Sequence, residues 1–181
     1  MQPHHIDNVL LPHDQIESRI EELAGTIATD FAGSSFVVVG VLRGSFVFLA
    51  DLVRALHHRG LRMQMDFLTL ESYGSGTTSS GTVRVSKDLW TGVAGRDVLL
   101  VDDILDSGRT LDFATRYLLL KGANAVHTCV FLDKPARRVV SVDARYIGFE
   151  VEDRFVVGFG LDYDGHYREL PYVAEVSFLD E

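Results

Sequence analysis

Cysteine is almost missing from this sequence of 181 residues, and so is any recognisable zinc-binding pattern. The single cysteine, Cys129, excludes an internal disulfide framework. It lies in a predicted strand over 124–132, so we expect a buried and unreactive thiol. The seven histidines form no His-Glu-x-x-His pattern, and the two adjacent pairs cannot share a helix face. A zinc site is therefore not expected.

Long apolar runs and positive charge are also scarce. No uninterrupted apolar run approaches the length of about 20 residues that a membrane-spanning helix needs. The first residues, Met-Gln-Pro-His-His, lack the regions of a signal peptide, so we expect a cytoplasmic protein that binds no membrane. With 17 Lys and Arg against 26 Asp and Glu, the net charge is −9. This balance disfavours a nucleic-acid-binding surface.

Two common nucleotide-binding patterns are absent as well. The segment 72–82 is rich in glycine, serine and threonine, but Ser79 stands where G-x-G-x-x-G requires its third glycine. No Walker A sequence is present, so an ATPase or a dinucleotide-dependent enzyme is disfavoured. A long segment of this composition is typical of a lid over a ligand or of plain disorder, and both interpretations stay open.

What the sequence does contain is a regular alternation of predicted helices and strands. The apolar periodicity predicts helices over 14–31, 46–58 and 109–121, and strands over 36–42, 62–70, 98–101, 124–132, 145–149 and 155–160. This order predicts an α/β protein in which helices cover both faces of a parallel sheet. The length is sufficient for one domain with a sizeable core.

The segment 98–110 is the most informative part of the chain. Four apolar residues predict a strand buried on both faces, and Asp102, Asp103 and Asp106 follow before a Ser-Gly-Arg-Thr turn. Such a turn before a helix presents free N–H groups that bind anions. Carboxylates beside an anion site at the carboxyl end of a strand favour a sugar phosphate with a divalent metal. The alternative is an acidic turn that only caps the next helix.

The same segment resembles the motif that binds 5-phosphoribosyl 1-pyrophosphate (PRPP) in type I phosphoribosyltransferases. Further segments extend the resemblance, in the order of the hypoxanthine-guanine phosphoribosyltransferase family, through most of 36–173: Val41-Leu42-Arg43-Gly44, Asp66-Phe67 with Ser72-Tyr73-Gly74, Leu132-Asp133-Lys134-Pro135, and 155–163 with 167–170. The resemblance implies one phosphoribosyltransferase domain over 1–181. It would have a Rossmann-like core at about 36–150, and a small hood formed by the N-terminal segment and about 151–181.

The resemblance also implies an activity. A member of this family transfers the phosphoribosyl group of PRPP to hypoxanthine or guanine, which gives IMP or GMP and pyrophosphate in purine salvage. The transition state is oxocarbenium-like, so the enzyme gains most by stabilising the charge on the sugar and on the leaving pyrophosphate. The family implies Mg²⁺ as cofactor, and a homodimer or homotetramer.

By resemblance, the acidic segment binds PRPP. Asp102 and Asp103 are expected to hold the ribose hydroxyls and Mg²⁺, since carboxylates accept hydroxyl donors and oxygen ligands suit this ion. Many relatives have glutamate at the position of Asp102. Asp106 is expected beside purine N7 as the general acid or base. The 5′-phosphate would be bound by Asp106, Ser107, Gly108, Arg109 and Thr110.

For pyrophosphate, the resemblance points to the Arg43-Gly44 loop and to Arg168, whose guanidinium fork matches phosphate oxygens. In the family the peptide before the basic residue is often cis, which the residues alone leave open. The alternatives are a plain turn at Arg43 and a surface salt bridge of Arg168 with Glu169 or Asp164. Ser72 and Tyr73 resemble the dipeptide of a lid that closes over PRPP and excludes water.

For the purine, Lys134 matches the lysine that hydrogen-bonds the 6-oxo group. Lysine only donates, so it favours hypoxanthine and guanine over adenine. Phe155 matches an aromatic that stacks on the base, and Val156 one that offers backbone groups to its edge. Asp162 resembles a residue near a second Mg²⁺ and the purine 2-position. A solvated lysine and a core phenylalanine are the structural alternatives.

Two other functions stay open. A xanthine-preferring phosphoribosyltransferase differs only in contacts at the purine 2-position, which backbone carbonyls make and sequence does not reveal. A nucleic-acid-binding regulator that uses PRPP as effector would keep the PRPP motif. Such a regulator carries a basic face, and this acidic chain has no evident basic stripe.

Overall fold

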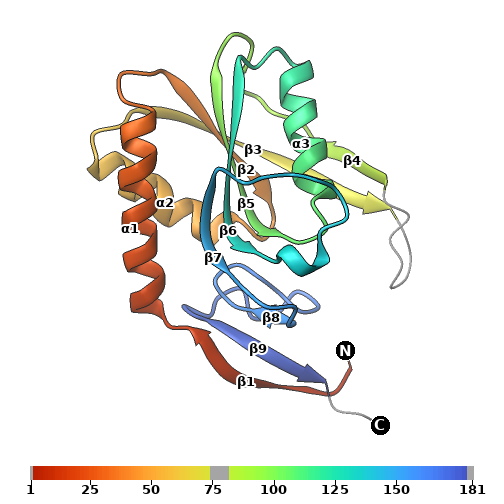
Figure 1. The fold of residues 1–181 in the computed structure, drawn as a ribbon. Coiled ribbons are helices and arrows are strands. Elements are labelled where there is room, and N and C mark those ends of the chain that lie inside the picture. Colours follow the sequence, from red (N-terminus) through yellow and green to blue (C-terminus); the bar gives the residue numbers. More distant parts are fainter. Residues whose placement is uncertain (1, 74–81, 179–181) are drawn as a thin grey trace.

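The computed structural model describes residues 2–73 and 82–178. Its described strands form two separate sheets, one of six strands and one of three (Figure 1). The order in the large sheet is β4-β3-β2-β5-β6-β7. The strands are β2 (Phe36–Leu42), β3 (Met63–Tyr73), β4 (Thr82–Lys87), β5 (Asp97–Leu105), β6 (Ala125–Asp133) and β7 (Tyr146–Glu150). All neighbours pair in parallel except β3 and β4, which are antiparallel.

Helices cover both faces of the large sheet, as the alternating pattern predicts. The helices α1 (His13–Asp30) and α2 (Phe46–His58) pack on one face, where their apolar residues join Val38 and Leu99 in one cluster. The helix α3 (Arg109–Leu120) packs on the other face in a second cluster with Val37 and Val98. Neighbouring strand residues thus belong to opposite clusters, as the alternation of side chains along a strand requires. No described helix is long and apolar enough to cross a membrane.

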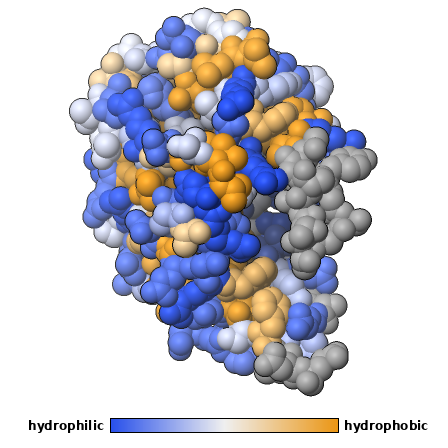
Figure 2. Space-filling view, turned by 45° about the vertical axis from the view of Figure 1, so that its right-hand side comes forward, coloured by the Kyte–Doolittle hydropathy of each residue, from blue (hydrophilic) through white to orange (hydrophobic). Residues whose placement is uncertain are grey.

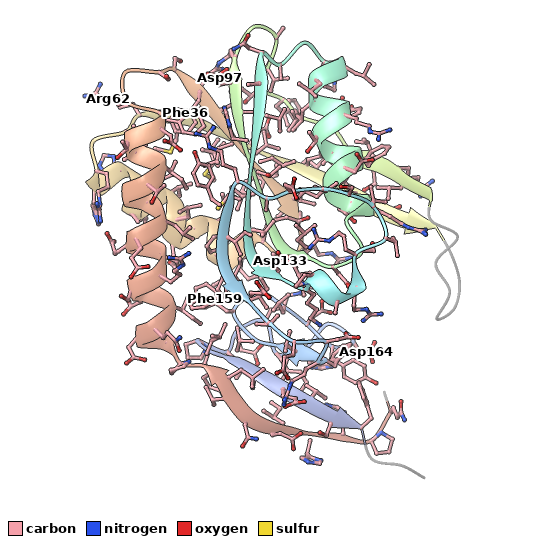
Figure 3. The ribbon with its side chains drawn as sticks, viewed as in Figure 1. Phe36, Arg62, Asp97, Asp133, Phe159 and Asp164 are labelled. Carbon is pink, nitrogen blue, oxygen red and sulfur yellow. The ribbon has the colours of Figure 1, made fainter. Side chains whose placement is uncertain are left out.

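The small sheet joins the two ends of the described chain. Its order is β1 (His4–Leu11), β9 (Val173–Phe178) and β8 (Val156–Val157), and all its pairs are antiparallel. It lies beyond the carboxyl ends of the large-sheet strands (Figure 1). Asp133, which ends β6, and Phe159 lie between the two sheets in Figure 3, whereas Phe36 and Asp97 lie at the opposite edge. Phe159 packs on Phe131 of β6, with 5.0 Å between ring centroids.

The α/β prediction is confirmed, and the predicted helices agree with the structure to within one residue at each end. Three strands, β1, β4 and β9, were not predicted. The predicted strand 155–160 is wrong beyond β8, because positive φ angles at Gly158, Phe159 and Gly160 end the extended backbone. The predicted loop 72–82 is wrong at its margins, since the backbone of Ser72 and Tyr73 belongs to β3 and that of Thr82 to β4. Residues 74–81 lie outside the described part.

Candidate active site

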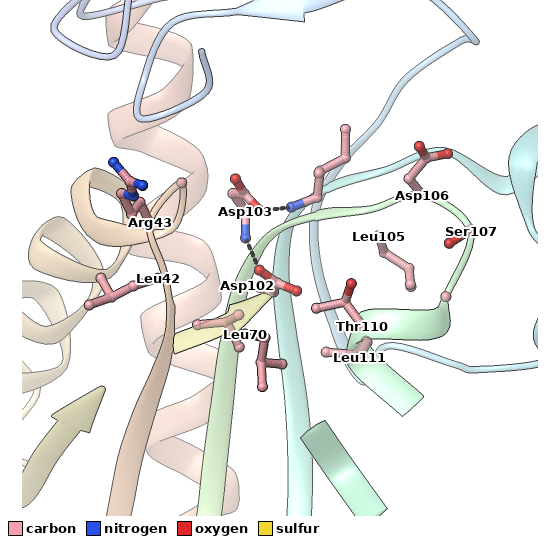
Figure 4. A pocket seen from close by; sticks show the side chains of 14 residues that line it. Leu42, Arg43, Leu70, Asp102, Asp103, Leu105, Asp106, Ser107, Thr110 and Leu111 are labelled. Carbon is pink, nitrogen blue, oxygen red and sulfur yellow. Dashed lines mark hydrogen bonds between the residues drawn. The ribbon is translucent and has the colours of Figure 1, made fainter. Parts of the chain in front are cut away.

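The candidate site lies between β2 and β5, where the order in which the chain adds strands to the large sheet reverses. From β2 the chain runs through α2 to β3 on one side, and from β5 through α3 to β6 on the other. The crevice outside the carboxyl ends of two such strands is the usual ligand site of open α/β sheets. A cavity of about 260 Å³ occupies this position. It is lined by residues 41–44, Leu70, 102–108, Thr110 and Leu111 (Figure 4).

Two neighbouring carboxylates at the end of β5 form the floor of this cavity. Asp102 is only 5% exposed, and its carboxylate accepts the Asp103 N–H at 3.0 Å. The Asp103 carboxylate accepts the Ile104 N–H at 2.8 Å (Figure 4). Burial and the Asp103 charge raise the pKa of Asp102 well above its usual range. Burial also raises the pKa of Asp103, against hydrogen bonds and the positive charge of Arg168, which lower it.

The aspartate pair fits a magnesium ion that is shared with a substrate. Mg²⁺ is usually bound by one or two carboxylates together with substrate phosphates and water. The adjacent carboxylates of Asp102, which is buried, and Asp103, which is partly buried, supply that number of protein ligands. The described residues contain no group of three or more side chains placed to hold a metal. The carboxylate of Asp162 is already engaged, since it pairs with Arg168 at 2.5 Å and accepts the Gly165 N–H at 2.8 Å.

The loop between β5 and α3 forms one wall of the cavity. Gly108 precedes the first residue of α3 and has φ of +87°, a conformation that glycine adopts without penalty. Ser107, Gly108 and Thr110 line the cavity, whereas the side chain of Arg109 does not. One carboxylate oxygen of Asp106 is buried and has no hydrogen-bond partner among the described residues. The Nε of Arg137 lies 3.3 Å from it, without hydrogen-bond geometry.

The loop after β2 packs closely against the aspartate pair. The Leu42–Arg43 peptide bond is cis. A Cβ at Gly44 would lie 1.5 Å from an Asp103 carboxylate oxygen. A Cβ at Gly160 would lie 2.2 Å from the Gly44 carbonyl oxygen. The absence of a side chain at Gly44 therefore allows this loop to lie directly on the carboxylate of Asp103.

A second cavity of about 490 Å³ adjoins the first and shares Leu42, Arg43 and Leu70 with it. Arg168 lines this cavity and donates to the Gly160 carbonyl at 2.6 Å. Its ion pair is with Asp162, and not with Glu169 or Asp164. Arg43 and Arg168 therefore face the same hollow. Figure 2 shows a hydrophilic hollow between the main body and the part that contains the small sheet.

The predicted purine-binding residues gather at the end of β6 and on the small sheet. Lys134 is 5% exposed and donates to the Arg154 carbonyl. Burial lowers the pKa of Lys134, against the negative charges of Asp106 and Asp153, which raise it. Phe155 is 42% exposed and makes edge contacts with the rings of Tyr163 and Phe178 at 5.5 and 5.3 Å.

Val156 is buried in β8 beside this ring, where it pairs with Glu175 of β9. Lys134, Phe155 and Val156 do not line either of the two cavities described above. The side chains of Ser72 and Tyr73, the predicted lid residues, lie outside the described part of the chain.

The sequence analysis missed Arg138. Its side chain donates to the carbonyl oxygens of Leu105, Asp106 and Val142, and it pairs with Asp133. Two of these acceptors lie 32 and 33 residues earlier in the chain. No periodicity or spacing rule detects contacts to backbone atoms at that separation, so the sequence carried no signal for this residue.

The described geometry agrees with comparisons to known proteins. A sequence profile of the phosphoribosyl transferase domain matches residues 8–164. The hypoxanthine phosphoribosyltransferase of Escherichia coli K12 is 44% identical over 179 residues, which are 98% of this chain and 99% of that protein. The hypoxanthine-guanine phosphoribosyltransferase of Bacillus subtilis is 40% identical over 174 residues, which are 96% and 95% of the two chains.

Solved structures give the same result. The crystal structure of a hypoxanthine-guanine phosphoribosyltransferase from Bacillus anthracis matches with a TM-score of 0.88 and 38% identity, and covers 97% of this chain and 100% of that chain. A hypoxanthine phosphoribosyltransferase from Staphylococcus aureus matches with a TM-score of 0.90 and 37% identity, over 95% and 92% of the two chains. Sequence and structure therefore agree along nearly the full length.

Proposed function

The chain belongs to the hypoxanthine-guanine phosphoribosyltransferase family and is a transferase of purine salvage, and we propose that it joins hypoxanthine or guanine to the phosphoribosyl group of PRPP in the cavity between β2 and β5. The observation that supports this site best is the pair of adjacent carboxylates, the buried Asp102 and the partly buried Asp103, beside the turn at Gly108. A pair of carboxylates next to an anion site suits a ribose that carries a phosphate.

In this proposal the β5–α3 loop holds the 5′-phosphate. The N–H groups around Ser107 and Gly108 and the hydroxyl of Thr110 supply donors at the start of α3, where the helix dipole favours an anion. Arg109 contributes through its backbone, since its side chain does not line the cavity. Asp102 and Asp103 accept the hydroxyls of the ribose, which fixes the sugar beneath the base.

The same two aspartates would hold Mg²⁺, on which enzymes of this family generally depend. When bound, this ion neutralises charge on PRPP and on the leaving pyrophosphate. Asp162 would contribute only after exchanging its present contacts with Arg168 and Gly165. Arg43 and Arg168 line the adjoining cavity and Gly44 lines the first one beside Arg43, and we assign these three residues to the pyrophosphate group. Ser72 and Tyr73 stay our candidates for the lid.

Asp106 is the proposed general acid or base. Its side chain lines the 260 Å³ cavity and is 38% exposed, so a base bound there would reach the carboxylate and exchange a proton at purine N7. Lys134 would donate to the 6-oxo group of the base and Phe155 would stack on its ring, with Val156 offering backbone groups and Asp162 near the 2-position. The small sheet would then act as the hood that covers the base.

The direct test is nucleotide formation from PRPP and Mg²⁺ with hypoxanthine, guanine, xanthine and adenine in parallel. We expect turnover with hypoxanthine or guanine and little with adenine, because Lys134 can only donate to position 6 of the base. Preference for xanthine would correct the assignment of the base. No turnover with any base, despite PRPP binding, would contradict the proposed activity. Sedimentation of the same protein would test the expected homodimer or homotetramer.

A further inference from the structure

The guanidinium of Arg138 donates hydrogen bonds to backbone carbonyls, two of which lie at the end of β5 and in the loop that we assign to the 5′-phosphate. Arg138 follows the short 3₁₀ helix η1 (Pro135–Arg137), and its side chain is 19% exposed. Nε donates to the Asp106 carbonyl at 3.1 Å, and Nη2 to the Leu105 carbonyl at 3.4 Å. Nη1 donates to the Val142 carbonyl at 2.7 Å, and the carboxylate of Asp133 balances the charge. The guanidinium thus has no role as a free cation.

The backbone next to Arg138 continues the same pattern. The N–H groups of Val139 and Val140 both donate to the Ser107 carbonyl, at 3.0 and 3.1 Å. The N–H of Lys134 donates to the Leu105 carbonyl at 2.9 Å. Three successive carbonyls, of Leu105 at the end of β5 and of Asp106 and Ser107 in the loop that follows, therefore all face the segment 134–140.

This arrangement decides where the loop's N–H groups point. In a trans peptide the C=O and the N–H lie on opposite sides, so carbonyls turned toward 134–140 turn the following amides away from it. Those amides belong to Asp106, Ser107 and Gly108, and all three residues line the 260 Å³ cavity. Within the described residues, none of the three amides donates to a protein acceptor. They are available to an anion in the cavity.

The packing between the two segments is tight as well as hydrogen-bonded. A Cβ at Gly108 would lie 2.8 Å from the Val140 carbonyl oxygen and 3.0 Å from the Arg138 side chain. The two segments are therefore in direct contact at Gly108, with no space for a side chain between them.

We propose that Arg138 is a positioning residue for the 5′-phosphate: by binding the carbonyls of Leu105 and Asp106, it holds the amides of Asp106 and Ser107 toward the cavity. The Gly108 amide is oriented by the backbone next to Arg138, through the hydrogen bonds from Val139 and Val140 to the Ser107 carbonyl. The proposal rests on the function proposed above. Arg138 would support the phosphate site without contacting the phosphate. Asp133 would contribute by pairing with the Arg138 guanidinium and holding it in place. Loss of Arg138 should free the loop peptides to rotate, and so weaken the 5′-phosphate site selectively.

The test compares two ligands that occupy different ends of the PRPP site. Calorimetry on the full chain would measure the affinities for ribose 5-phosphate and for pyrophosphate with Mg²⁺. In Arg138→Met we expect the affinity for ribose 5-phosphate to fall by about 10- to 100-fold, as for the loss of hydrogen bonds from a charged group. The affinity for pyrophosphate should stay within about twofold, because Arg43 and Arg168 lie on another wall.

Two further variants make the test decisive. Arg138→Lys keeps the charge beside Asp133, but one ammonium cannot replace the fork, so we expect a smaller, still selective loss. It also provides the answer if Arg138→Met does not fold. Arg116→Met, on the exposed face of α3, should leave both affinities unchanged. Unchanged ribose 5-phosphate binding in the Arg138 variants, or equal weakening of both ligands, would overturn the inference. A wild-type protein that bound neither ligand would instead overturn the proposed function, and the inference with it.

Discussion

The two ends of the proposed site are built in different ways. The phosphate region, residues 102–110, is one continuous stretch at the end of β5, and backbone hydrogen bonds and burial hold it in place. The base region combines Lys134 after β6, 154–156 at β8, Tyr163 and Phe178 of β9. The phosphate region is positioned by local structure, whereas the base region forms only when segments far apart in the sequence pack together.

The two regions also differ in their electrostatics and exposure. In the phosphate region, burial raises the pKa of two neighbouring carboxylates, so the site gains from a cation and from hydroxyl donors. In the base region, burial lowers the pKa of Lys134, while the ring of Phe155 stays 42% exposed. In the proposed assignment, the charged part of the substrate would therefore bind hydrogen-bonded carboxylates and backbone groups. The flat base would bind a partly exposed aromatic surface.

The largest effect should come from Asp106→Asn, at the junction of the two regions. The amide keeps the shape of the side chain but cannot exchange a proton with N7, so turnover should fall by about 10²- to 10⁴-fold. PRPP affinity should change little, because the loop amides remain. Single-turnover kinetics with PRPP titration would separate these effects. Asp112→Asn on α3 is the matched control, and normal turnover in Asp106→Asn would remove the acid–base role.

The next effect tests how rigid the phosphate region is. In Gly44→Ala the new Cβ would lie 1.5 Å from an Asp103 carboxylate oxygen, so either the loop or the carboxylate must move. Such a displacement should lower kcat/KM for PRPP by about 10²-fold. Gly92→Ala, where a Cβ meets no atom within 4 Å, should match the wild type in steady-state kinetics. Equal kinetics for both variants would show that the loop at Gly44 can move away from Asp103 without loss of activity, against the close packing seen here.

The same contrast explains which parts of the molecule the sequence predicted. The strands β2 and β5 are buried on both faces, and their apolar runs predict them directly. The phosphate region followed from them, since its residue types and their order lie together in the chain. The family resemblance added roles to the more distant residues.

The small sheet was harder to predict because its strands are stabilised by each other. β1 contains His4, His5 and Asp7, and its burial pattern shows no regular alternation. Only pairing with β9, more than 160 residues away, makes it a strand. The role of Arg138 was not predicted for a related reason, since two of its acceptors are backbone carbonyls far away in the sequence. Local patterns encode local structure, and these features depend on long-range contacts.

A smaller effect, confined to the base region, is expected from Lys134→Met. Loss of a charged donor to the 6-oxo group should weaken binding of hypoxanthine by about 10- to 100-fold, and should reduce discrimination against adenine. PRPP affinity should stay near that of the wild type. Competition between hypoxanthine and adenine in a binding assay measures the affinity for hypoxanthine and the discrimination against adenine. Lys121→Met, at the C-terminal end of α3, is the control for loss of a lysine elsewhere. An equal loss of PRPP and base affinity would mean that the two regions are not independent.

The smallest effect should come from Phe155→Leu. Leucine keeps most of the apolar area but loses the stacking of one ring, a contribution of about 0.5 to 1.5 kcal/mol, so base affinity should fall by about 2- to 13-fold. Because the ring is 42% exposed and its contacts with the rings of Tyr163 and Phe178 are edge contacts, the fold should tolerate the change. Equilibrium titration with guanine measures the effect, and Phe113→Leu on α3 controls for loss of a ring elsewhere. A fall in PRPP affinity, with base affinity unchanged, would reverse the assignment of the two regions.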